Sequence, residues 1–164
     1  MDGNPNTQPL VPSLLDRLID EDPGGPRQPP TPGYQLLRDL KQSVCRDLQN
    51  LLNTRTRFLA WGTHLRELDQ SLLSYGLPDF NSVNLASESD RMRFCRLIED
   101  VIRNNEPRLF EVRVTPRTEG EPDDRVLRFR IEGLLRVEPA PEQVAFDSLV
   151  KPATGNVEVK RANR

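Results

Sequence analysis

Apolar side chains recur every three or four positions along two long stretches of the sequence. In the first stretch the apolar positions are Leu37, Leu40, Val44, Leu48 and Leu51. In the second stretch they are Phe94, Cys95, Ile98, Val101 and Ile102. This spacing places them on one face of an α-helix. We therefore predict two amphipathic helices, the first from Thr31-Pro32 to about Asn53 and the second from Ser87 or Ser89 to the break at Glu106-Pro107.

Two shorter helical segments are also predicted. Residues 13–19 carry four apolar side chains after a serine that can cap a helix. A linker at residues 23–32, half of it proline, separates this segment from the rest of the chain. We therefore expect residues 1–33 to form a flexible arm with a short helix, and residues 34–162 to form a single domain. Inside that domain, Leu65, Leu68 and Leu72 indicate another short helix that ends at Tyr75-Gly76-Leu77-Pro78.

After Pro107 the apolar period changes from 3.6 residues to two, which is typical of β-strands. Phe110, Val112 and Val114 are predicted to share one face of the first strand. A longer second strand has the inner positions Leu127, Phe129, Ile131, Gly133, Leu135 and Val137. Residues 144–146 and 156–160 are shorter strand candidates around a turn at 152–155. This order predicts an α+β fold, with helices packed on one face of a small antiparallel sheet and a tethered N-terminal helix.

Charge and hydropathy narrow the classes of partner. The chain has 164 residues with 25 acidic and 23 basic side chains, so its formal net charge is −2. A near-neutral balance argues against nucleic acid as a partner. No apolar run approaches the ~18 residues of a membrane span, so direct membrane insertion is not expected. Residues 1–12 also lack the pattern of a secretory signal.

Few residues are suited to hold a metal or a cofactor. Cys45 and Cys95 lie on the predicted apolar helix faces, and with His64 they lack the spacing of a zinc site. The glycines are scattered and form no phosphate-binding loop. We therefore expect no metal and no cofactor, and two reduced, buried thiols in a cytoplasmic protein.

The candidate catalytic groups are also weak. Glu106 is the most distinctive carboxylate, but Arg108 lies two residues further along an extended chain, so both side chains point to the same side. A neighbouring guanidinium lowers a carboxyl pKa, which does not suit the general acid of a glycosidase. His64 is the single histidine and has no placed partner for nucleophilic catalysis. We therefore predict no catalytic residues.

Three features instead favour binding to other proteins. The strand at residues 156–160 is short and ends on a lysine, as an edge strand that accepts a strand from another chain would. The alternative is that it only completes the sheet of its own domain. Glu106-Pro107-Arg108 offers an acceptor and a forked donor beside a proline-fixed backbone. The tethered apolar helix is a third candidate for docking.

Five segments together, in this order, resemble a known family. They are SLLDRL at 13–18, VCRDLQNLLNTR at 44–55, SLLSYGLPDF at 71–80, EPRL at 106–109 and VAFD at 144–147. Their order and distances resemble TssE, the family of type VI secretion baseplate subunits, which is similar to the "lysozyme-like" wedge protein of contractile phage tails. The resemblance covers about residues 13–160. It departs from the family pattern at Thr56, Ser74 and Phe80.

The resemblance implies a non-enzymatic baseplate part in the cytoplasm, docked on the inner-membrane complex. Its partners would be TssF, TssG, TssK and the contractile sheath subunits, whose first ring it would help to nucleate. Glu106, Pro107 and Arg108 match the signature of the family and are expected to contact the wedge. An added sheath strand would lie over Val157 and Val159, with Val144 and Phe146 nearby. The alternatives are a peptidoglycan hydrolase and a cytosolic anti-adaptor of the same fold.

Overall fold

The computed structural model describes residues 18, 33–56, 64–65, 67–68, 71–80, 87–117, 126–138, 140–151 and 154–162. The helical elements are α2 (Gly33–Asn53), the 3₁₀-helix η2 (Leu72–Ser74) and α3 (Glu88–Asn105). The strands are β1 (Leu109–Arg117), β2 (Leu127–Leu135), β3 (Glu142–Lys151) and β4 (Asn156–Arg161). Leu18 is helical, and the remainder of the predicted helix at 13–19 and the proline-rich linker lie outside the described residues.

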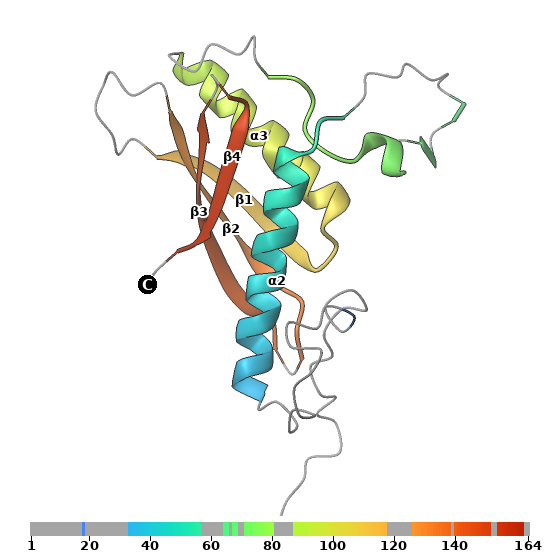
Figure 1. Cartoon of the computed structure of the whole chain (residues 1–164), viewed down its shortest axis with the longest axis vertical. Helices are drawn as coiled ribbons and strands as arrows, with labels where there is room; N and C mark the ends of the chain where they lie inside the picture. The colour runs from blue at the N-terminus through green and yellow to red at the C-terminus, as the bar shows by residue number, and fades with distance from the viewer. Residues whose placement is uncertain are drawn as a thin grey trace, which may run out of the picture.

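The four strands form one antiparallel sheet in the order β1-β2-β3-β4. Helix α3 packs against β1 at one edge, and α2 packs against β4 at the other edge (Figure 1). Alternate residues of each strand are buried, as in β2, because one face of the sheet is covered by the helices. This arrangement confirms the predicted α+β class.

The core lies between the helices and the covered face of the sheet. Leu48 and Leu52 of α2 and Ile98 and Ile102 of α3 are fully buried there, at the helical spacing that the sequence predicts. The segment after η2 returns to the core and adds Phe80, whose ring centroid lies 4.9 Å from that of Phe94. The remaining buried apolar side chains include Leu77, Phe129, Ile131, Leu135, Phe146 and Val150.

The two long helices end as the sequence predicts. Helix α2 stops at Asn53, and Ser87 caps α3 by accepting a hydrogen bond from the Asp90 N–H at 3.5 Å. Glu106 is the C-cap residue of α3, and its N–H donates to the Ile102 carbonyl at 2.8 Å. No helix in the described part of the chain is long and apolar enough to cross a bilayer.

The first strand differs from its prediction at Phe110. A β-bulge between Phe110 and Arg113 sets Glu111 and Val112 against Gly133, and Glu111 has a φ of 51°. The extra residue reverses the alternation, so Leu109, and not Phe110, points into the core with Val112. Phe110 lies under the Arg136 guanidinium, whose central carbon is 5.5 Å from the ring centroid.

Two other predicted elements also differ. Strand β3 has ten residues and includes 142–151, because it pairs with β2 along the whole length of β2. In the predicted helix through Leu65, Leu68 and Leu72, the described helical residues are 3₁₀-helical, at 67–68 and in η2, where Leu72 is 89% exposed. Gly76 has the predicted positive φ, 110°, and an added Cβ would lie 2.5 Å from the Thr54 carbonyl oxygen.

Candidate functional site

A cluster of ion pairs surrounds Arg108 at the corner between α3 and β1. The Arg108 guanidinium donates to both Glu106 carboxylate oxygens, at 2.7 and 2.5 Å. It also donates to Asp47 Oδ2 at 2.6 Å and to Ser43 Oγ at 3.3 Å, both on α2. Arg108 thus joins its near neighbour Glu106, as the sequence predicts, to a helix more than sixty residues earlier in the chain.

The ion-pair cluster around Arg108 is largely buried and holds this corner of the fold in place. The Glu106 side chain is 7% exposed and that of Arg108 is 26% exposed, so their contact is largely shielded from water. The hydrogen bonding of the Arg108 guanidinium to the Glu106 carboxylate is the main cause that raises the pKa of Arg108, and Asp47 adds to it. Burial, followed by the Asp47 and Glu106 carboxylates, also raises the pKa of the Tyr75 hydroxyl. The guanidinium therefore stays charged and holds the corner in place.

Pro107 is the part of the motif that faces solvent. It is exposed between the buried Glu106 and the half-buried Arg108. The backbone on both sides is fixed, because the Leu109 N–H donates to the Glu106 carbonyl at 3.1 Å and the Arg136 N–H donates to the Arg108 carbonyl at 2.8 Å. The motif therefore presents a rigid proline corner, while its carboxylate is turned inward.

The four apolar residues predicted to receive a sheath strand lie together. Val157 and Val159 of β4 and Val144 and Phe146 of β3 are all buried in the core, on the side that α2 covers. In the sheet of the described residues, β4 is one of the two edge strands and pairs with β3. A strand added here would therefore bind through the backbone of β4, with these side chains supporting β4 from below.

The register shows which backbone groups of β4 are directed outward. The Ala162 N–H donates to the Ala145 carbonyl at 3.0 Å, so this opposed pair is hydrogen bonded. Opposed pairs in an antiparallel ladder alternate between bonded and non-bonded. Val157 and Val159 are therefore at positions whose N–H and C=O point away from β3.

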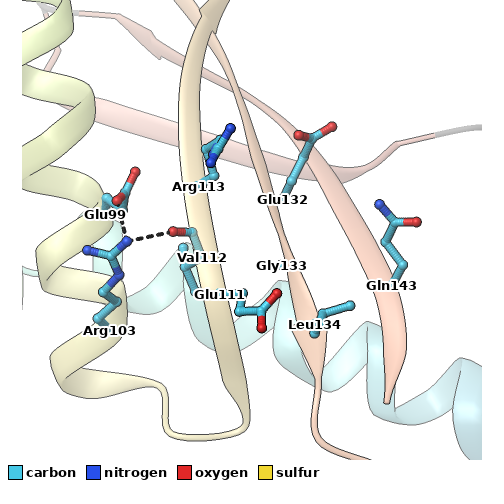
Figure 2. A pocket seen from close by; sticks show the side chains of 9 residues that line it. All are labelled: Glu99, Arg103, Glu111, Val112, Arg113, Glu132, Gly133, Leu134 and Gln143. Carbon is cyan, nitrogen blue, oxygen red and sulfur yellow. Dashed lines mark hydrogen bonds and ion pairs between the residues drawn. The ribbon is translucent and has the colours of Figure 1, made fainter. Parts of the chain in front are cut away.

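A groove of about 530 Å³ begins beside α3 and extends across β1 and β2 to β3 (Figure 2). It is lined by Glu99, Arg103, Glu111, Val112, Arg113, Glu132, Gly133, Leu134 and Gln143. Glu99 and Arg103 come from α3 and form an ion pair at 2.5 Å. The other residues come from the bulge of β1 and from β2 and β3. Acidic and basic side chains alternate around the groove, which does not single out a ligand of one charge.

The other chemical candidates are dispersed. Cys45 and Cys95 are buried and free, and burial is the main cause that raises the pKa of each thiol. His64 is exposed. Within the described ranges, no group of three or more His, Cys, Asp or Glu side chains is placed to hold a metal ion.

Sequence reasoning missed the α2 residues that complete these sites. Asp47 and Ser43 are four residues apart, beside the buried Val44 and Leu48, so the helix period places them next to the apolar face. Asn53 also acts at a distance, because its side-chain amide both donates to and accepts from the backbone of Val157. The periodicity indicates that such residues lie near the core, but not which partner they meet.

Comparisons with known proteins give one family. The family model described as baseplate wedge protein gp25 matches residues 38–140, which include Asp47 and the whole Glu106-Pro107-Arg108 motif. No curated protein matches the chain. A chain in a solved structure of the baseplate complex from the type VI secretion system is 23% identical, with a TM-score of 0.48. That match covers 70% of this chain and 96% of the other.

Proposed function

Since the chain belongs to the family of the baseplate wedge protein gp25, we propose that this structural baseplate subunit serves a type VI secretion apparatus without catalysing a reaction. Its work there is to join the wedge to the first ring of the contractile sheath. The observation that carries this proposal is the match of the family model to residues 38–140, the range that holds the Arg108 cluster. The chemistry at Glu106 supports a non-enzymatic role, because its carboxylate is held by Arg108 on both oxygens.

The wedge contact is proposed to be the corner formed by Glu106, Pro107 and Arg108. Buried ion pairs hold the corner in one conformation before any partner arrives, and a preformed surface loses less entropy on binding. The exposed Pro107 and the accessible part of Arg108 would then contact the wedge proteins TssF, TssG and TssK. Glu106 would act through Arg108, because its own side chain is buried.

The sheath contact is proposed to be the outer edge of β4. Its backbone groups at Val157 and Val159 already lie in the geometry of a strand and point away from β3. An incoming sheath strand could form ladder hydrogen bonds without first ordering a partner strand, which removes part of the conformational-entropy cost of nucleation. The subunit would work in the cytoplasm, at a baseplate docked on the inner-membrane complex.

A pair of substitutions at Val159 tests the sheath contact. Val159→Pro removes an N–H that points away from β3, so the β3–β4 ladder keeps its own hydrogen bonds. Val159→Ala is the matched control, because it loses buried side-chain volume but keeps the N–H. In a bacterium that carries the apparatus and lacks its own copy of this subunit, we expect fluorescent sheaths to assemble with the alanine variant and to be lost with the proline variant. Equal numbers of sheaths in both strains would contradict the proposal.

Substitution of the exposed Pro107 by Glu tests the wedge contact without touching the buried pairs. We expect Pro107→Glu to unfold in urea at the same midpoint as the wild-type chain but to recover little TssF, TssG or TssK in a pull-down. Undiminished recovery would contradict this contact. A stable partner from outside any secretion apparatus would instead support the anti-adaptor alternative, and muramidase activity of the pure protein would support the hydrolase alternative.

A further inference from the structure

Side chains from the helices occupy outward backbone groups on both edge strands of the sheet. At the β4 edge the side-chain amide of Asn53, the last residue of α2, faces Val157. Its Nδ2 donates to the Val157 carbonyl at 2.8 Å and its Oδ1 accepts from the Val157 N–H at 2.9 Å. These are the two hydrogen bonds that one residue of a neighbouring antiparallel strand would make. Asn53 therefore stands in the place of a strand at one position of β4.

The rest of the β4 edge is held weakly. In the part of the chain that the structure describes, the donor to the next outward carbonyl, that of Val159, is the Cys45 thiol at 3.5 Å, and a thiol is a weak donor. The Asn53 amide is neutral, and its side chain is exposed at the end of its helix. At Val157 an extended segment that approaches from solvent has to replace the exposed Asn53 side chain, whose Nδ2 also donates to the Gln49 carbonyl at 2.7 Å. At Val159 it has to displace the buried Cys45 thiol of α2 as well.

The β1 edge is closed by a different set of groups. Arg103 Nη2 donates to the Val112 carbonyl at 3.0 Å (Figure 2). Glu99 Oε2 accepts from the Val114 N–H at 3.1 Å. Pro116 occupies the next position on the same side of the strand and has no N–H to offer. At three successive outward positions of β1, one backbone group is thus already occupied or absent.

The side-chain hydrogen bonds that occupy the β1 edge are stronger than those at the β4 edge. Glu99 and Arg103 are an ion pair on the same helix, and each also makes a charge-assisted hydrogen bond to β1. Hydrogen bonds with a charged partner are about twice as strong as neutral ones. An incoming peptide would have to leave both charges without their partners at β1, whereas at β4 it would replace uncharged groups, the Asn53 amide and the Cys45 thiol.

We propose that the two helices select which edge of the sheet accepts a strand: Glu99, Arg103 and Pro116 seal β1, while Asn53 holds β4 until an incoming strand replaces its amide. The occupant is an extended segment of a partner protein, because the groups on offer are the N–H and C=O of successive outward residues. This inference rests on the proposed addition of a sheath strand at β4 and names the residues that direct it.

Hydrogen–deuterium exchange of the full chain, with and without purified sheath subunits, tests the selection. We expect added sheath subunits to protect residues 156–161 and to leave residues 109–117 unchanged. In Asn53→Ala the Val157 N–H of the free chain should exchange faster than in the wild-type chain. Half-maximal protection of β4 should also need about tenfold less sheath subunit, because the substitution removes about 1.4 kcal/mol of competing hydrogen bonds. Asn50→Ala is the matched control, because Asn50 is exposed on the same helix.

A triple variant tests the seal on β1. In Glu99→Ala/Arg103→Ala/Pro116→Thr we expect residues 109–117 to gain protection from sheath subunits as well, while the exposed-site control Arg96→Ala behaves as wild type. Three results would each overturn the inference but leave strand addition at β4 standing. They are protection of β1 in the wild-type chain, no protection of β1 in the triple variant, and weaker protection of β4 in Asn53→Ala. No protection at either edge would overturn the proposed strand addition and this inference together.

Discussion

Arg108 and Asp47 lie 61 positions apart in the chain, yet the guanidinium and the carboxylate meet at 2.6 Å. This contact ties the middle of α2 to the corner where α3 turns into β1. The same guanidinium holds the buried Glu106 at that corner. One side chain therefore connects both helices to the first strand.

Arg108→Ala is expected to destabilise the fold by about 3–5 kcal/mol, because it leaves the buried Glu106 carboxylate without its partner. Urea unfolding of the purified chain measures this. Arg46→Ala is the control, because Arg46 approaches the same Asp47 at 3.5 Å from a more exposed position and should contribute at most about 1 kcal/mol. Similar losses in the two variants would show that the cluster is a surface feature.

Gly76→Ala is expected to destabilise by at least about 2 kcal/mol. Its φ of 110° is a conformation that side chains rarely adopt, and the new Cβ would lie 2.5 Å from the Thr54 carbonyl oxygen. That oxygen also accepts the Leu77 N–H at 2.9 Å, so it cannot move away without loss of a hydrogen bond. Thermal unfolding would measure the effect. An unchanged midpoint would mean that the link between α2 and this segment is loose.

Glu111 is the single non-glycine residue with positive φ in the described part of the chain. Glu111→Gly should therefore be neutral or stabilising by up to about 1 kcal/mol, because it relieves a left-handed conformation. Glu111→Val should be destabilising, because β-branched side chains tolerate this conformation least. Urea midpoints for the pair provide the comparison. A valine variant at least as stable as the glycine variant would argue that the bulge is not retained in solution.

The Cys95 thiol makes the free energy of unfolding depend on pH in the alkaline range. Burial, with a smaller contribution from Glu99, raises the pKa of its thiol from 9.0 to about 11. The folded chain then holds this proton more tightly than the unfolded chain, so the contribution to stability is complete below pH 9 and is lost as the pH rises toward 11. We expect the urea midpoint to fall more between pH 8 and pH 10 in the wild-type chain than in Cys95→Ala. Parallel losses would contradict the assignment.

The regular parts of the fold follow from local patterns. The helical stripes, such as the one that includes Phe94 and Ile98, and the alternation of β2 repeat over many residues, so the two long predicted helices and the central strand are confirmed. Phe110 was assigned to the wrong face because one inserted residue at a bulge reverses everything before it. Gly133 was a signal for this bulge, since a Cβ there would lie 3.3 Å from the Phe110 carbonyl oxygen.

The sequence predicts only part of the candidate site. Glu106 and Arg108 are close neighbours, so local geometry predicts their pairing. Asp47 and Asn53 act on partners that the fold brings from the other end of the chain, and nothing in the helix period names those partners. Pro116 follows the apolar alternation that predicts the first strand, and the structure places it inside β1. Whether Pro116 blocks the addition of a strand depends on which side of β1 lacks a neighbouring strand.

The unequal edges of the sheet bear on how an assembly could grow from this chain. A protein whose strands can be extended on both sides can repeat itself without limit, as fibrils do. Here one side ends in a proline and a fixed pair of opposite charges. Such a molecule suits the first place in a row of subunits but not the repeating one, so the length of the polymer would be governed by the units that follow it.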